Sequence, residues 1–194
     1  MSNNTITVLL CGVGGQGTIL AADVLARCAM ASGQDVKLSE IHGMAQRGGA
    51  VTTVVRLGDK VSSMVADKGA ADYLVAFETT EALRNISFLA EDGALFVNDE
   101  SVQPLPVLTG NASMPENVHE RLDGYGATVI PAAQLAVEAG SIKAVNIVLM
   151  GALSTRLPYA EELWLDVIAG RVPAKFKDVN IAAFKAGRAF ALQN

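Results

Sequence analysis

The feature that most constrains the fold is a glycine-rich segment at residues 11–17 (CGVGGQG), which directly follows an apolar run. Residues 5–10 are rich in β-branched and aliphatic side chains, which predicts a fully buried strand. After the glycines, apolar residues recur at helical spacing up to Gly33, a typical helix end. A short strand at 34–40 then completes a βαβ unit, so the chain begins as a Rossmann-like α/β fold.

The rest of the chain continues the alternation of strands and helices, with one interruption. Residues 50–65 hold two β-rich runs around Gly58 and Asp59, which predicts an inserted β-hairpin. Either Thr79 or Thr80 is expected to cap the helix that begins there. Further strands are predicted at 71–77, 93–98 and 126–132, and helices at 79–89, 132–139, 143–157, 159–170 and 180–193. Together these elements predict a single three-layer α/β domain over residues 1–194, with an inserted β-hairpin and C-terminal helices.

Composition and charge narrow the classes of partner. Hydrophobic residues make up 51% of the 194 and charged residues 18%, which is typical of a globular chain. The net charge is −5 and no Lys/Arg cluster occurs, so we expect no nucleic-acid partner. No window approaches the ~18 apolar residues of a membrane span. The first residues also lack the pattern of a signal peptide, so we expect a cytoplasmic protein that does not contact a membrane.

The chain has only two cysteines, Cys11 and Cys28. Two thiols cannot hold a four-thiolate iron–sulfur cluster, and no spacing of Cys or His indicates a zinc site. We therefore expect no metal ligand on this chain, and two reduced thiols that pack as small apolar side chains.

The glycine segment allows three interpretations. Gly12, Gly14 and Gly17 fit the dinucleotide pattern G-x-G-x-x-G, in which glycines permit a tight turn, close approach of an anion, and close packing of the helix. Glu40 lies near the position of the acidic residue that holds a ribose in such folds. The segment is also compatible with another anion or cofactor, or with a purely structural turn. A chain with no second domain and no evident acid–base pair does not resemble a free-standing dehydrogenase.

A second glycine loop at 39–49 (SEIHGMAQRGG) concentrates polar side chains where α/β sheets bind ligands. Arg47 stands beside two glycines and can fork onto a carboxylate or phosphate, and Gln46 offers both a donor and an acceptor. Structural roles remain open for each residue: an ion pair for Arg47, a hydrogen bond within the loop for His42, and a cap for Glu40. His119 is expected to be a solvated surface residue.

Three segments together resemble the gamma-type domain of 2-oxoacid:ferredoxin oxidoreductases: GVGGQG (12–17), SEIHGMAQRGG (39–49) and VTTVVRLGDKV (51–61). The form HGMAQRGG favours the members of that family that act on indolepyruvate. The resemblance extends to ADYLVAFETTEALR, VNIVLMGAL and NIAAFKAGR, and is weakest across 99–125. The glycine motif alone is unspecific, whereas two glycine loops in this order and spacing are specific.

The resemblance implies a subunit that is not active alone. Such enzymes oxidatively decarboxylate 2-oxoacids, here aryl pyruvates, with coenzyme A as acyl acceptor and ferredoxin as electron acceptor. Thiamine diphosphate with Mg and the [4Fe-4S] clusters would belong to a larger alpha subunit, the implied partner in a heterodimer. We expect none of these groups to be bound by this chain alone, because the thiamine diphosphate motif is also missing from its sequence.

The resemblance assigns candidate site residues to the two glycine loops. His42 and Arg47 are candidates for a place near the substrate. Candidate contacts with coenzyme A, the thiamine site or the partner are Gly12, Gly14, Gly15, Gln16, Gly17, Glu40, Gln46, Arg47, Gly48 and Gly49. Two alternatives stay open: a gamma subunit for pyruvate, a branched-chain 2-oxoacid or 2-oxoglutarate, and a stand-alone Rossmann nucleotide-binding module.

Overall fold

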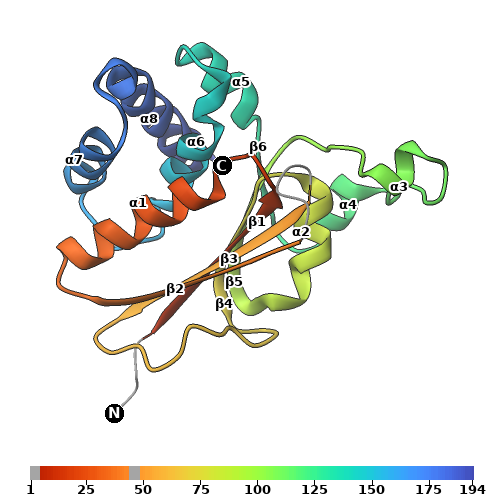
Figure 1. Ribbon diagram of the computed structural model, residues 1–194, viewed down its shortest axis with the longest axis horizontal. Coiled ribbons are helices and arrows are strands. Elements are labelled where there is room, and N and C mark those ends of the chain that lie inside the picture. Colours follow the sequence, from red (N-terminus) through yellow and green to blue (C-terminus); the bar gives the residue numbers. More distant parts are fainter. Residues whose placement is uncertain (1–4, 44–48) are drawn as a thin grey trace.

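The structure is a computed structural model that describes residues 5–43 and 49–194, and it is built on one six-stranded sheet (Figure 1). The strand order is β2-β3-β1-β4-β5-β6. The last four strands in this order, β1, β4, β5 and β6, pair parallel with one another, whereas β3 is antiparallel to both of its neighbours, β1 and β2. The strands are β1 (Ile6–Val13), β2 (Asp35–His42), β3 (Ala50–Gly58), β4 (Ala71–Ala76), β5 (Leu89–Asn98) and β6 (Thr128–Ile130).

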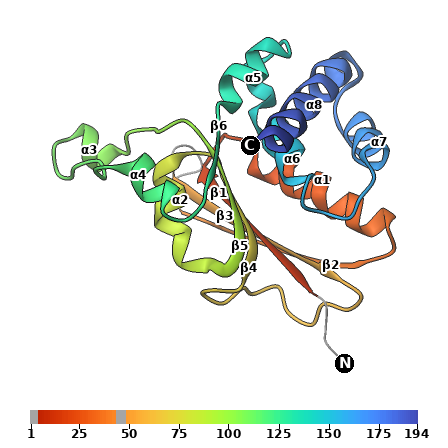
Figure 2. The same cartoon turned by 180° about the vertical axis from the view of Figure 1, so that it is seen from behind.

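Helices lie on both sides of the sheet (Figures 1 and 2). The larger group comprises α1 (Thr18–Ala31), α5 (Ala132–Glu138), α6 (Val145–Leu153), α7 (Glu161–Arg171) and α8 (Lys177–Gln193). The other side carries α2 (Thr79–Asn85) and α4 (Val118–Asp123). Short 3₁₀ turns occur at Ile86–Phe88, Ile142–Ala144 and Ala174–Phe176. The segment between β5 and α4, residues 99–117, projects from the body of the protein, and we call it the arm. It contains the one-turn helix α3 (Leu105–Leu108).

The period-two alternation of β1 builds the core on both faces of the sheet. Val8 and Leu10 belong to the core beneath α1 and α6, and Leu9 and Cys11 belong to the core beneath α2. All four side chains are fully buried, which explains why the sequence of this strand is a continuous apolar run. The helix α6 is buried at every position from 146 to 153, so it forms the centre of the larger helical layer.

Helices α6 and α8 cross at two glycines. A Cβ atom added at Gly187 would collide with the carbonyl oxygen of Val148, and one added at Gly151 would collide with the carbonyl oxygen of Phe184. The two backbones therefore approach so closely that neither position has room for a methyl group. This contact attaches the C-terminal helix to the layer that covers the sheet.

The α/β fold class predicted from the sequence is confirmed, but the hairpin is at a different place. The second β-rich run, after Gly58 and Asp59, forms no strand between 59 and 70, a stretch that the structure describes throughout. The hairpin consists of β2 and β3, which pair antiparallel from Asp35 with Gly58 to His42 with Val51. The extra β3 strand thereby separates β2 from β1.

Two smaller expectations about helix ends had different outcomes. Gly33 follows α1 with a left-handed φ of 82°, as expected of a residue just past a helix end. The expected cap of α2 by Thr79 or Thr80 is wrong, because Glu78 is the N-cap residue and its side chain makes no capping hydrogen bond. Thr80 instead bonds through its hydroxyl to Ser101, at 3.0 Å.

Within the part of the chain described here, no helix is both long and apolar enough to cross a membrane.

The glycine crossing gives a direct test of the helical layer. We expect Gly187→Ala to lower the free energy of unfolding by about 2 kcal/mol or more, because overpacking of this kind displaces whole backbones. Gly170→Ala in α7 is the matched control, since an added Cβ there meets no atom within 4 Å. Alanine is the better helix former, so the control is expected to gain up to about 1 kcal/mol. Urea unfolding of both variants checks this, and equal stabilities would contradict the close crossing.

Candidate functional site

The glycine turn at residues 14–17 joins the carboxyl end of β1 to the start of α1. Gly15 and Gly17 have φ angles of 104° and 83°, in the left-handed region that glycine adopts without strain. Gly17 is also the N-cap residue of α1, and its carbonyl oxygen accepts the N–H of Ala21. The backbone N–H groups that begin α1 therefore have no intrahelical partner, the arrangement that binds anions in other α/β folds.

Gly12 and Gly17 are both required by close packing. For Gly12 this differs from the tight turn expected from the sequence. A Cβ atom at Gly12 would lie 2.8 Å from Cβ of Phe77, and one at Gly17 would lie 2.6 Å from Nδ2 of Asn146 on α6. Gly12 therefore lies within β1, before the turn, and its missing side chain makes room for Phe77. Gly17 permits contact of the turn with α6, in addition to its left-handed conformation.

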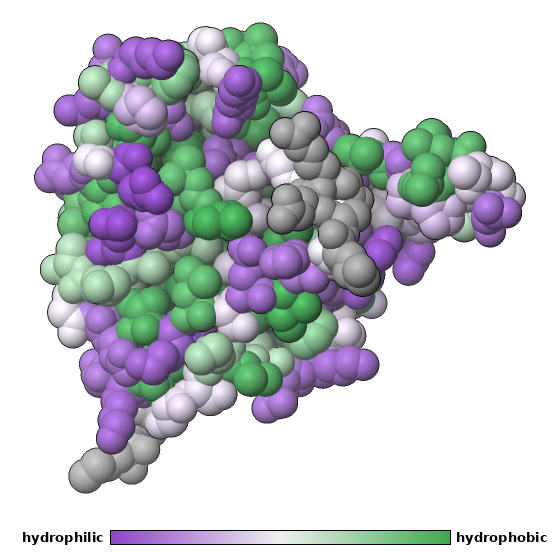
Figure 3. Space-filling view, viewed as in Figure 1, coloured by the Kyte–Doolittle hydropathy of each residue, from purple (hydrophilic) through white to green (hydrophobic). Residues whose placement is uncertain are grey.

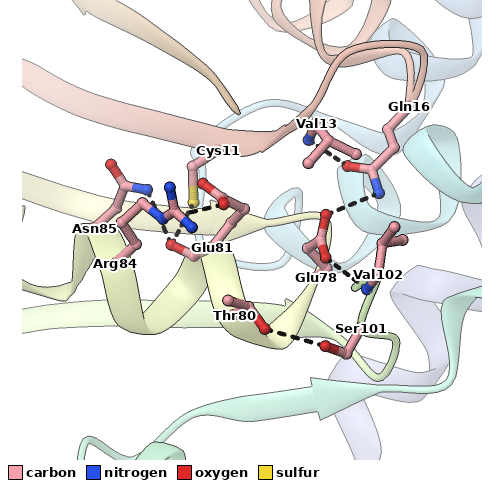
Figure 4. A network of polar contacts seen from close by, with 10 residues as sticks. All are labelled: Cys11, Val13, Gln16, Glu78, Thr80, Glu81, Arg84, Asn85, Ser101 and Val102. Atoms are coloured by element: carbon pink, nitrogen blue, oxygen red, sulfur yellow. Dashed lines mark hydrogen bonds and ion pairs between the residues drawn. The ribbon is translucent and has the colours of Figure 1, made fainter. Parts of the chain in front are cut away.

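The side chain of Gln16 is used within the fold (Figure 4). Its Oε1 atom accepts the N–H of Val13 at 2.7 Å, and its Nε2 atom donates to Oε1 of Glu78 at 3.4 Å. Oε2 of Glu78 accepts the N–H of Val102 at 2.8 Å. Glu78 is only 1% exposed, and loss of water raises the pKa of its carboxyl group. Gln16 therefore fixes the turn to the end of β4 and to the arm.

The second glycine loop meets the first through the backbone. The N–H of Gly14 donates to the carbonyl oxygen of Gly49 at 2.9 Å, and the N–H of Gly43 donates to that of Ala50 at 3.2 Å. The first four positions of the predicted loop, residues 39–42, belong to β2. Three of the candidate residues, Gln46, Arg47 and Gly48, lie outside the described residues.

A pocket of about 430 Å³, which we call the glycine pocket, lies where these two segments meet. His42 is exposed at its mouth, and its Nδ1 atom lies 3.2 Å from the carbonyl oxygen of Gly43. The residues around it come from the turn, the start of α1, and the ends of β2 and β3: Gly14, Gly15, Gly17, Thr18, Ile19, Glu40, His42 and Val51. The structure thus brings five of the candidate residues, three glycines with Glu40 and His42, to one concave surface.

The strand order argues against the dinucleotide interpretation of Glu40. In dinucleotide-binding folds the strand that carries the ribose-binding acid is the immediate neighbour of β1. Here β3 lies between β1 and β2, and Glu40 pairs with Thr53 of β3. The added strand moves Glu40 by about 5 Å from the usual ribose position, since neighbouring strands have that spacing.

A second pocket of about 430 Å³, which we call the lysine pocket, flanks the other side of the glycine turn. It contains residues that sequence reasoning missed: Asn98, Glu100 and Lys143. Asn98 is 1% exposed and ties three segments together, because its Nδ2 donates to the carbonyl oxygen of Phe77 and its Oδ1 accepts the N–H of Ala132. The signal that could have identified it is a polar residue at the carboxyl end of a buried strand.

No group of three or more His, Cys, Asp or Glu side chains that could hold a metal ion occurs among residues 5–43 and 49–194. Cys11 and Cys28 are free and buried, as expected, in the cores on opposite faces of the sheet. Burial raises the pKa of Cys11 well above its usual range and that of Cys28 to about 12, so neither is a reactive thiolate. His119 is exposed, as expected, and bonds to Asp99 at 2.7 Å.

The site geometry can now be compared with known proteins. The family model described as pyruvate ferredoxin/flavodoxin oxidoreductase matches residues 7–190. The indolepyruvate oxidoreductase subunit IorB of Thermococcus kodakarensis is 39% identical over 187 residues, which cover 93% of each chain. The gamma subunit of a keto/oxoacid ferredoxin oxidoreductase from Geobacter sulfurreducens superposes with a TM-score of 0.74 at 26% identity, over 97% of this chain and 99% of that one.

A third comparison concerns a longer protein. The 2-oxoglutarate:ferredoxin oxidoreductase of Magnetococcus marinus shares the fold, with a TM-score of 0.68 at 22% identity. The match covers 98% of this chain and only 31% of that one, so the same unit occurs there within a longer polypeptide.

The chain therefore belongs to the pyruvate ferredoxin/flavodoxin oxidoreductase family. Within it, the chain is similar to IorB subunits of indolepyruvate oxidoreductases, which confirms the resemblance indicated by the two glycine loops.

The buried carboxyl group of Glu81 makes the stability of the protein depend on pH. Burial and the nearby charge of Glu78 raise its pKa, although the guanidinium of Arg84 opposes the shift. A raised pKa in the folded state means that stability falls as the pH rises from the ordinary glutamate value of about 4.3 through the higher folded value. We therefore expect the melting temperature of Glu81→Gln, relative to the wild type, to increase from about pH 4 to about pH 7.

The matched control for that measurement is Glu91→Gln, which removes an exposed carboxylate at the amino end of β5. Thermal melts of the three proteins at both pH values check the prediction. A difference between Glu81→Gln and the wild type that stays constant with pH would contradict it.

Proposed function

We propose that this chain is the smaller subunit of a coenzyme A-dependent 2-oxoacid:ferredoxin oxidoreductase that acts on indolepyruvate and related aryl pyruvates. The observation that carries the proposal is the joining of the two glycine loops by the Gly14–Gly49 hydrogen bond, at the edge of the sheet where α/β folds bind ligands. The identity to IorB over 93% of the chain supports the choice of substrate.

The redox chemistry in this proposal belongs to a larger partner subunit in the cytoplasm. Thiamine diphosphate with Mg and the [4Fe-4S] clusters would be held by that partner, and ferredoxin would take up the electrons. The two thiols of this chain support this division, because they are buried on opposite faces of the sheet and cannot ligate one cluster. The whole chain, residues 1–194, would act as one domain that completes the partner's site.

Coenzyme A is the group whose chemistry best fits the residues around the glycine turn. Its phosphates require hydrogen-bond donors and positive charge, which the free N–H groups at the start of α1 and the side chain of Lys143 supply. The solved structure of the Magnetococcus marinus protein is described with 2-oxoglutarate, coenzyme A and succinyl-CoA bound. In our proposal the turn and Lys143 hold and orient the coenzyme, and His42 stands at the mouth of the glycine pocket near the substrate.

An assay of the assembled complex tests the proposal. We expect the chain, coexpressed and purified with its larger subunit, to reduce ferredoxin with indolepyruvate and coenzyme A, and to prefer aryl pyruvates over pyruvate, 2-oxoisovalerate and 2-oxoglutarate. The larger subunit alone is expected to lose most of this turnover. A preference for one of the other acids would show that the chain is a subunit for that 2-oxoacid and not for aryl pyruvates. A complex without any 2-oxoacid-dependent turnover would refute the proposal.

The second glycine loop gives a sharper test at one residue. In the complex, Arg47→Ala is expected to raise the KM for coenzyme A or for the 2-oxoacid about tenfold or more, because a charge-assisted hydrogen bond to an anion contributes about 1.5–3 kcal/mol. Arg121→Ala, an exposed arginine on α4, is the control for loss of a positive charge. Unchanged turnover and unchanged KM values in Arg47→Ala would reduce this residue to a structural role.

A further inference from the structure

A third pocket lies beside the arm, on the face of the sheet that carries α2. It has a volume of about 360 Å³, and we call it the acid pocket. Its floor is formed by the ends of β1 and β3 and by α2, and its rim by the arm before and within α3. The residues that line it are Val13, Ala50, Glu78, Thr80, Glu81, Arg84, Val102, Gln103, Pro104, Leu105 and Leu108.

The floor of the acid pocket holds a carboxylate with an unused oxygen (Figure 4). Glu81 is 3% exposed, and its Oε1 atom pairs with Nε of Arg84 at 3.2 Å. Its Oε2 atom is buried and has no hydrogen-bond partner among the residues that the structure describes. A buried acceptor without a partner costs about 1–3 kcal/mol, so a group that donates to this oxygen from outside the chain would be stabilising.

The backbone of Glu81 is fixed both by its own helix and by β1. Its carbonyl oxygen accepts Nδ2 of Asn85 on α2 at 2.9 Å and the thiol of Cys11 on β1 at 3.5 Å, both of them buried. The first turn of α2, which carries this carboxylate, is therefore attached to the sheet. The neighbouring Glu78 is different, because both of its oxygens already accept hydrogen bonds, from Gln16 and Val102.

The rim of the acid pocket is apolar and exposed. Val102, Leu105 and Leu108 are 50%, 71% and 65% exposed. They lie on the arm, which projects from the body in Figure 1 and carries hydrophobic atoms on its surface in Figure 3. Several large apolar side chains gathered at one exposed place are typical of a surface that another protein covers.

We propose that the acid pocket receives an arginine side chain of the larger partner subunit, with the guanidinium at Glu81 and the aliphatic stem against Leu105 and Leu108. This inference rests on the proposed function, which requires such a partner. Two buried carboxylates, Glu78 and Glu81, face a single cation, Arg84, so the pocket is complementary to a positive charge. Arginine combines an apolar stem with a forked donor, and it is enriched at the centres of protein interfaces.

Charge at the floor is tested by Glu81→Gln in the assembled complex. We expect the subunit dissociation constant to rise on the order of tenfold, and the salt dependence of dissociation to become weaker, because the variant has no carboxylate to pair with the incoming cation. Mass photometry of the purified complex, diluted at several NaCl concentrations, measures both quantities. Glu91→Gln at the opposite end of the sheet is the matched control and is expected to match the wild type.

The rim is tested independently by the double variant Leu105→Ser/Leu108→Ser, whose exposed positions leave the core intact. It too is expected to raise the dissociation constant on the order of tenfold, since loss of two buried anchors weakens an interface by more than about 1 kcal/mol. Leu192→Ser on α8, which is 67% exposed, is the control. Unchanged dissociation constants in both the floor and rim variants would overturn the proposal, as would dissociation of a second copy of this chain in place of the larger subunit.

Failure of this inference can be told apart from failure of the proposed function. If the variants dissociate like the wild type while the complex still oxidises aryl pyruvates, the acid pocket is not the docking site and the proposed function stands. If the purified complex has no 2-oxoacid-dependent turnover, the proposed function fails whatever the dissociation constants are.

Discussion

The side chain of Gln16 is the contact on which the organisation of the site depends. It spans from the N–H of Val13, at the end of β1, to the carboxylate of Glu78, at the end of β4. Gly12 makes this possible, because a side chain there would collide with Gln16 and Phe77. Through Glu78 the same connection reaches Val102 and the arm. The side chain of Gln16 thus connects the glycine turn to Glu78, which lines the acid pocket.

The antiparallel strand β3 sets the second constraint. Because β3 runs antiparallel beside β1, its first residue Ala50 lies opposite Val13, at the carboxyl edge of the sheet. The carbonyl oxygen of Gly49, just before β3, can therefore accept the N–H of Gly14. The same strand moves Glu40 away from the place where a dinucleotide ribose would need it. One topological change therefore explains both the joining of the two glycine loops and the departure from a dinucleotide site.

Much of this architecture could be predicted from local patterns. The buried strand β1, the end of α1 near Gly33 and the buried helix α6 all follow from apolar periodicity and glycine placement. The position of the hairpin could not, because residues 60–65 have a strand-like composition but find no partner strand. Whether a segment pairs as a strand depends on its tertiary contacts, and β propensity alone does not determine it.

The candidate site was predictable only in part for the same reason. The sequence placed Gly14, Gly15, Gly17, Glu40 and His42 in two loops, and the structure brings them to one pocket. Glu81, Asn98 and Lys143 were not selected, because their importance comes from burial and from neighbours distant in the sequence. Gln16 was selected as a candidate ligand contact, whereas its side chain is engaged in holding the turn.

We propose that the edge formed by the two glycine loops faces the partner subunit and receives coenzyme A. Hydrogen–deuterium exchange of the assembled complex, with and without coenzyme A, tests this placement most directly. We expect coenzyme A to slow exchange of the backbone N–H groups at 14–19 and 40–43, with no change at the opposite end of the sheet. Exchange at 14–19 that is unaffected both by assembly and by coenzyme A would contradict it.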